Sequence, residues 1–223
     1  MELISGMGVI IAALMTGDSF ELQTALRGNA GMWPLGFMAT LFGGLAVAAL
    51  YRAVPFIERN LEPTVMVVAY LAIGYIIFAG GIQRFYLSGQ PAWSTTLPPF
   101  LFLIMTWVGC SYNVKLRTHL AFAEFRKVAP RGVQLGLLIL DAILWFGFAW
   151  IVIVTTAQET VRAAANYAIM LGTDNVMQWW FLGTVPIAFI LLAARVFENL
   201  SQDLRKYRNG NEMIETAVIG GDA

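Results

Sequence analysis

The fold class follows from one stretch, residues Val133 to Ala157, which reads VQLGLLILDAILWFGFAWIVIVTTA. It contains a single ionisable side chain, Asp141. An α-helix rises 1.5 Å per residue, so roughly 20 apolar residues cross the hydrocarbon core of a bilayer, which is about 30 Å thick. The stretch is longer than that, and it therefore predicts a transmembrane helix.

Four further segments have the same character. They run from about Met32 to Val54, Thr64 to Leu87, Leu97 to Val114 and Val176 to Leu200. None shows the alternating segments of about ten residues that are typical of membrane β-barrels. The sequence therefore predicts an all-α, polytopic membrane bundle of about five transmembrane helices.

The composition agrees with this prediction and excludes several classes of function. Hydrophobic residues make up 58% of the 223 residues and charged residues 13%, whereas soluble domains carry about 25% charged residues. The net charge is zero, so no basic excess points to nucleic acid. Cys110 and His119 are the only residues of their kinds, which argues against a disulfide framework, a zinc site or bis-histidine haem ligation. We expect no cofactor and no metal.

The basic residues predict an orientation. Three regions, 51–63, 115–132 and 195–208, together hold 11 of the 14 lysines and arginines, and alternation of the spans puts all three on one side. The positive-inside rule makes that side cytoplasmic. The N-terminus is then periplasmic and the C-terminus cytoplasmic. The apolar stretch Leu3 to Thr16 is short for a span, so five and six helices both remain open.

Two polar stretches predict amphipathic helices at the membrane surface. Glu159 to Leu171 is expected to lie on the outer side. The stretch from Lys115 to Arg131 reads KLRTHLAFAEFRKVAPR, and its cations alternate with apolar side chains. That pattern is typical of a helix lying among anionic headgroups.

Ionisable side chains in or near the spans are the candidate functional residues, because charge is costly in hydrocarbon. Asp141 is either an ion or proton site or a polar contact to a neighbouring helix. Arg84 either reaches the headgroups or binds a partner carboxylate. The full set of candidates for contact with a partner or with lipid is Arg84, Lys115, Arg117, His119, Arg126, Lys127, Arg131 and Asp141.

Signatures of independent function are missing from the sequence. It has no phosphate-binding glycine loop, no pair of metal ligands at helical spacing and no nucleophile elbow. It also lacks the repeated halves of a self-sufficient transporter. We therefore expect a non-enzymatic subunit of a larger membrane complex, whose glycines, such as Gly44 and Gly81, serve close helix packing.

From Thr64 onward the chain resembles the small membrane subunit of tripartite ATP-independent periplasmic (TRAP) transporters. The strongest similarity is WVGCSYNVKLRTHLAF, Trp107 to Phe122, in which a glycine, a basic loop and a histidine follow one another. IERNLEP at Ile57 to Pro63 is similar to the amphipathic segment that precedes the family's first helix. Two departures concern Ala123, where the family often has an acidic residue, and the stretch after Trp93, which lacks a glutamate.

The resemblance implies a domain organisation. Residues 1–31 would form an extracytoplasmic or interfacial segment and 32–56 an extra N-terminal transmembrane helix. Residues 57–204 would form the four-helix small-subunit domain, and 205–223 a cytoplasmic tail.

The resemblance also implies a function. A periplasmic substrate-binding protein would capture an organic anion, such as a carboxylate or sulfonate. A large membrane transport subunit would import it with a sodium gradient across the bacterial inner membrane. This chain would brace the scaffold of the large subunit and contact membrane lipids. The alternatives are a membrane anchor for a redox enzyme and a small channel that functions alone.

Overall fold

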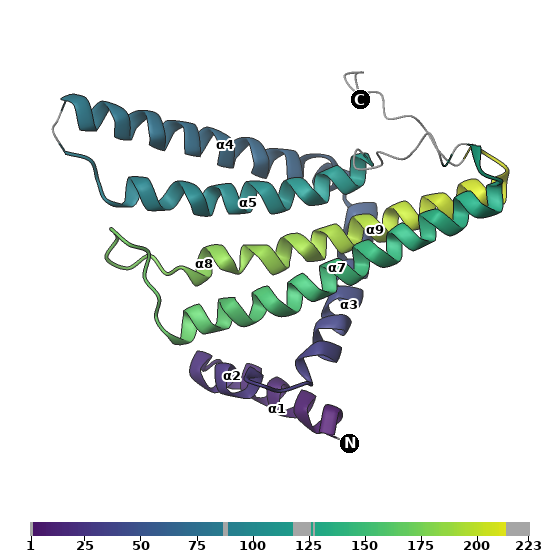
Figure 1. Cartoon of the computed structure of the whole chain (residues 1–223), viewed down its shortest axis with the longest axis horizontal. Helices are drawn as coiled ribbons and strands as arrows, with labels where there is room; N and C mark the ends of the chain where they lie inside the picture. Colours follow the sequence, from purple (N-terminus) through teal and green to yellow (C-terminus); the bar gives the residue numbers. More distant parts are fainter. Residues whose placement is uncertain (1, 87–88, 118–125, 127, 213–223) are drawn as a thin grey trace.

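The computed structural model describes residues 2–86, 89–117, 126 and 128–212 (Figure 1). These residues are overwhelmingly helical, and their only β pairing is an isolated bridge between Ile169 and Met177. The helices are α1 (Glu2–Thr16), α2 (Ser19–Leu26), α3 (Met32–Ala53), α4 (Pro55–Tyr86), α5 (Trp93–Leu116), α7 (Arg131–Ala165), α8 (Trp179–Leu182) and α9 (Thr184–Asn209).

Five helical stretches are long and apolar enough to cross a membrane. They are α3, α4, α5, α7 and the consecutive pair α8 and α9. The predicted all-α bundle of about five transmembrane helices is therefore confirmed. The shorter apolar helix α1 has 15 residues, fewer than the roughly 20 that a span requires.

Two helices extend beyond their predicted limits. α4 begins at Pro55 rather than near Thr64. Proline is compatible with this first position, because no intrahelical partner for its missing N–H is needed there. α7 continues to Ala165. The predicted separate helix from Glu159 to Leu171 was therefore wrong: its first half is the end of α7, and its second half follows the helix as a loop.

α9 is the central helix of the bundle. It packs against α3, α5 and α7, while α4 lies at the edge and packs mainly on α5 (Figure 1). In the most apolar part of the span formed by α8 and α9, 44% of the residues are buried, against at most 22% in any other span. Phe189 and Leu192 of α9 are fully buried and form the core with residues of α5 and α7. This arrangement also places the charged side chains Arg195 and Asp203 of α9 inside the protein.

Small side chains let α3 approach α9 closely. Thr40, Gly44 and Ala48 are buried at four-residue spacing along α3. A Cβ added to Gly44 would lie 3.0 Å from Ala193 Cβ and 2.9 Å from Phe197 on α9. Such spacing is how membrane helices bring their backbones together. A Cβ added to Gly81, in contrast, would meet nothing within 4 Å, so this glycine serves no close packing between the described helices of this chain.

The two N-terminal helices lie against the bundle rather than apart from it. α1 packs on α3, and α2 packs on α7 (Figure 1). Asn29 links the pieces, because its amide donates to the carbonyl oxygen of Gly6 at 3.1 Å and its side-chain oxygen accepts from the Gly31 backbone N–H at 2.9 Å. The segment is thus a structured part of the protein.

The bundle has two chemically different ends. At one end, here the basic end, α3, α5 and α9 finish and α4 and α7 begin, and Arg52, Lys115, Arg117 and Arg131 all bond to residues there. The opposite end, the tryptophan end, carries Trp33, Trp93, Trp179 and Trp180 at or near the starts of α3, α5 and α8.

Candidate functional site

The most distinctive polar feature is a buried arginine near the basic end of α9. The Arg195 side chain is 1% exposed, and it faces Glu62 of α4, which is fully buried. Arg195 Nε donates to Glu62 Oε1 at 2.9 Å, and Nη2 donates to Oε2 at 2.5 Å. This is the bidentate arrangement that matches guanidinium to carboxylate geometry.

The remaining donors of Arg195 are also used. Nη1 donates to Glu58 Oε1 at 3.0 Å and to Glu198 Oε2 at 2.7 Å, and Nη2 donates to the Glu58 carbonyl oxygen at 2.8 Å. A guanidinium has five N–H groups, and all five therefore have acceptors. A buried charge needs such complete pairing, since an unpaired one is strongly destabilising.

Two further helices complete the shell around Glu62. Ser111 Oγ of α5 donates to Glu62 Oε1 at 3.0 Å, and the Tyr51 hydroxyl of α3 donates to the same oxygen at 3.4 Å. The Tyr51 ring centre lies 4.0 Å from Arg195 Cζ, a cation–π contact. One carboxylate thus joins α3, α4, α5 and α9. We call Arg195, Glu62, Glu58, Glu198, Tyr51, Ser111 and Lys115 the arginine cluster.

Lys115 belongs to the cluster through Glu58. Its Nζ lies 2.6 Å from Glu58 Oε1 and donates to the Glu58 carbonyl oxygen at 3.1 Å. The cluster contains three carboxylates and two cations. Each carboxylate is paired with a cation, and among the described residues no group of three or more His, Cys, Asp or Glu side chains is arranged to hold a metal ion. The arrangement can hold helices in register.

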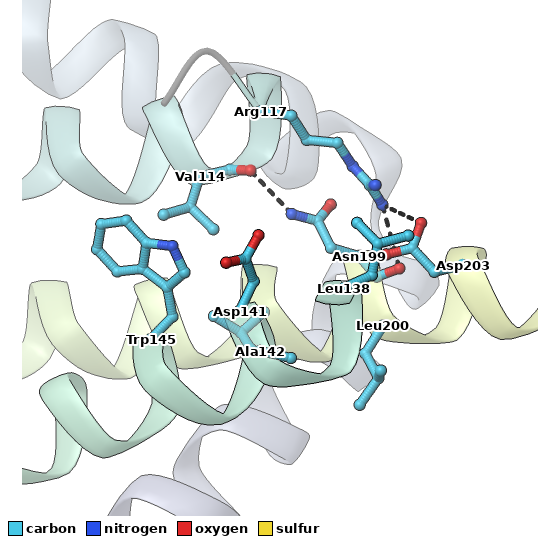
Figure 2. Close-up of a pocket in the computed structure, with 10 residues that line it drawn as sticks. Val114, Arg117, Leu138, Asp141, Ala142, Trp145, Asn199, Leu200 and Asp203 are labelled. Atoms are coloured by element: carbon cyan, nitrogen blue, oxygen red, sulfur yellow. Dashed lines mark hydrogen bonds and ion pairs between the residues drawn. The ribbon is translucent and has the colours of Figure 1, made fainter. Parts of the chain in front are cut away.

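A second polar group lies further toward the basic end (Figure 2). Arg117 Nη2 lies 2.8 Å from Asp203 Oδ1 of α9, whose side chain is 5% exposed, and Asn199 donates to the carbonyl oxygen of Val114 at 2.8 Å. Asp141 faces the same cavity of about 40 Å³ and pairs with Arg126 at 2.5 Å. Arg117, which follows α5, is thus paired with α9, and Arg126 is paired with α7.

The structure separates the candidate residues into three groups. Lys115, Arg117, Arg126 and Asp141 make ion pairs within the chain, and Arg131 donates to the Asn211 carbonyl oxygen at 2.9 Å. Arg84 is exposed near the tryptophan end and makes no hydrogen bond or ion pair with a described residue. His119 and Lys127 lie outside the described residues, as does most of the predicted interfacial helix from Lys115 to Arg131.

Sequence reasoning missed the centre of the arginine cluster. Glu58 and Glu62 fall in a segment expected to be a connector, and Arg195 and Glu198 fall in the last turns of a span. Their spacings, i to i+4 and i to i+3, put each pair on one helix face. Two such pairs of charged residues, one in the segment before a span and one at the end of a span, were the available signal for a buried ionic contact.

Removing Arg117 is expected to destabilise the fold, although the residue belongs to an apparent basic loop. Arg117→Ala leaves the buried Asp203 without its ion pair, a cost of about 1–3 kcal/mol. Arg131→Ala, the same change at the same end, removes only an exposed hydrogen bond and should cost less than about 0.5 kcal/mol. Thermal unfolding of both variants in detergent checks this, and equal stabilities would contradict it.

Fold and polar clusters together define a multi-pass α-helical membrane protein whose buried charges are paired with one another. Residues 73–206 match the family model described as tripartite ATP-independent periplasmic transporters, DctQ component. The matched range runs from within α4 to within α9 and contains Ser111, Lys115, Arg195 and Glu198. This chain therefore belongs to the DctQ family of transporter subunits, and it is not an enzyme.

Two relatives illustrate the range of this family. The chain is 28% identical over 134 residues to the C4-dicarboxylate TRAP transporter small permease protein of Pseudomonas aeruginosa, covering 59% of this chain and 64% of that protein. It is 24% identical over 144 residues to the sialic acid TRAP transporter small permease protein of Vibrio cholerae, covering 65% and 82%. The first alignment thus spans slightly less than two thirds of the Pseudomonas protein. Helices α1, α2 and α3 precede the family match.

Proposed function

We propose that this chain is the small membrane subunit of a sodium-coupled transporter that imports organic anions, such as carboxylates or sulfonates, delivered by a periplasmic binding protein. The observation that carries the proposal is the family match across residues 73–206. The names of the two relatives refer to a C4-dicarboxylate and to sialic acid, both of which carry carboxylates. A carboxylate substrate is therefore the first choice here.

The proposed orientation follows from the basic end. Arg52, Lys115, Arg117 and Arg131 gather there, and the positive-inside rule favours the cytoplasm for such an end. The tryptophan end and the N-terminal helices would then face the periplasm, on the side of the binding protein. The C-terminus would be cytoplasmic.

We further propose that α4 contacts the large subunit. Tyr70 and Tyr75 lie near the middle of this edge helix, are 66% and 74% exposed, and make no hydrogen bond with a described residue. A hydroxyl without a partner is unfavourable in hydrocarbon. A protein surface that offers acceptors suits this face better than lipid does. The arginine cluster would fix α4 to the rest of this chain on the side opposite the large subunit. A rigid α4 suits a subunit that braces an immobile scaffold.

Site-specific crosslinking tests the proposed contact. A photoactivatable amino acid at Tyr75 should give a crosslink to the large subunit when the full transporter is expressed together. The matched control is Ile143 on α7, which is 62% exposed and apolar, and which should crosslink weakly or not at all. Crosslinks of equal yield, or none from Tyr75, would contradict the assignment of this face.

Reconstitution tests the function itself. Proteoliposomes that contain both membrane subunits should take up a carboxylate substrate only with the binding protein and an inward sodium gradient. Omitting this chain should abolish uptake. Uptake that is unchanged without it, or conductance by this chain alone, would overturn the proposal.

A further inference from the structure

The N-terminal helices and α7 enclose two adjoining pockets of opposite character. An apolar cavity of about 280 Å³ lies between α1, α3 and α7 and is lined by residues such as Ile10, Leu35 and Val154. A polar pocket of about 520 Å³ lies between the end of α2 and the end of α7. Leu26 and Gln158 line both, so the two spaces adjoin.

Charge distinguishes the polar pocket from an ordinary surface depression. It contains Arg27, Arg162 and Glu159. These arginines are two of the three basic residues outside the three basic regions of the sequence, and both border this one pocket. Glu159 Oε1 lies 3.7 Å from Arg162 Nη1, a loose contact between side chains that are each 64% exposed. The Arg27 side chain makes no hydrogen bond or ion pair with a described residue.

From this juxtaposition we infer that the N-terminal helices and α7 form a binding site for one aminophospholipid. An acyl chain fills the apolar cavity, because its walls offer van der Waals contact and almost no polar groups. The phosphate lies between Arg27 and Arg162, which donate several N–H groups to it. The headgroup amine meets Glu159. Each part of the ligand thus has a matching part of the site.

The depth of the site fits a lipid in one leaflet. α1 is too short to span and exposes Ile4, Leu14 and Met15, which places it in the apolar layer near the tryptophan end. The last turns of α7 carry the charged residues, at the height expected for headgroups. The elements that complete the site, α1, α2 and α3, precede the family match at residue 73. The lipid would therefore hold this chain's N-terminal addition on the common bundle.

Native mass spectrometry tests the proposal on the full chain purified with its complex and washed with detergent. The wild type should retain one phospholipid per chain. Arg27→Gln combined with Arg162→Gln should lower its occupancy about tenfold, and Ala157→Phe, which fills the apolar cavity, should lower it likewise. Arg84→Gln, an exposed arginine outside the pocket, is the matched control and should retain the lipid.

Added lipids then distinguish the ligands. Phosphatidylethanolamine should raise the thermal unfolding temperature of the delipidated wild type more than phosphatidylglycerol does, and Glu159→Gln should remove that preference. Equal effects of diacylglycerol, which has no phosphate, would overturn the proposal. Occupancy that is unchanged in both pocket variants would also overturn it. The double arginine variant alters only exposed side chains, so it should fold even if Ala157→Phe does not.

Discussion

Arg195→Met is expected to destabilise this protein by about 3–5 kcal/mol, the largest effect of any single substitution considered. The change removes all five hydrogen bonds from the guanidinium and leaves Glu62 as a charge with no exposed surface. Ser111 and Tyr51 still donate to that carboxylate, but neither carries a positive charge. Thermal unfolding in detergent, followed by the fluorescence of the seven tryptophans, measures the loss.

Two further variants make this expectation specific. Arg208→Met is the same change on the same helix, but Arg208 is exposed, and it should cost less than about 0.5 kcal/mol. Arg195→Met combined with Glu62→Met should recover at least half of the loss, because methionines of similar size can replace a buried ion pair without leaving a lone charge. If the double variant is as unstable as the sum of the two single variants, the two side chains are not coupled as proposed.

Gly44→Leu is the second change expected to have a large effect, at about 1–3 kcal/mol or more. A single Cβ at this position already lies 3.0 Å from Ala193 Cβ and 3.3 Å from the Ala193 carbonyl carbon. A leucine side chain therefore requires α3 to move away from α9. That movement also withdraws Tyr51 from Arg195, so packing and the arginine cluster are disturbed together.

The matched control is Gly74→Leu. Gly74 is also a helical glycine, on α4, but a Cβ there would meet nothing within 4 Å. Leucine has a higher helix propensity than glycine, so this variant should be neutral or slightly stabilising when the chain is measured without the large subunit.

The separation of α3 and α9 in Gly44→Leu can be measured directly by forming a disulfide between two cysteines, one placed on each helix. Unaltered crosslinking and stability in Gly44→Leu would show that the two helices are not in close contact there.

Length and hydropathy were sufficient to predict the number of long membrane helices, because a bilayer demands apolar segments of a minimum length. The limits of α4 and α7 were not predictable in the same way. Residues 55–63 and 158–165 are polar enough to resemble connectors, yet they continue their helices. In residues 55–63 polar side chains bond to neighbouring helices, and residues 158–165 lie at the exposed end of α7. Hydropathy reports neither the bonding partners nor the continuation of a helix beyond the apolar layer.

For the candidate residues, too, the sequence showed the charges and the structure showed their partners. The charges of Arg117, Arg126 and Asp141 were evident in the sequence, but whether they faced lipid, a partner or one another was open. The structure brings each arginine onto an aspartate of this chain. Arg131 is exposed and bonds to a backbone carbonyl oxygen, and Arg84 is exposed and makes no hydrogen bond or ion pair with a described residue.

Whether a segment prefers lipid or water depends on its own apolar residues, as in Val133 to Ala157. The sequence was therefore enough to establish a helical membrane protein. The partners of the buried charges are a property of packing. Glu62 and Arg195 are 133 residues apart, and only the packing of α4 on α5, and of α5 and α3 on α9, brings them together. Coulomb energy and desolvation depend on that distance and burial rather than on order along the chain. The arginine cluster and the adjoining pockets at the N-terminal helices were therefore decided by tertiary structure.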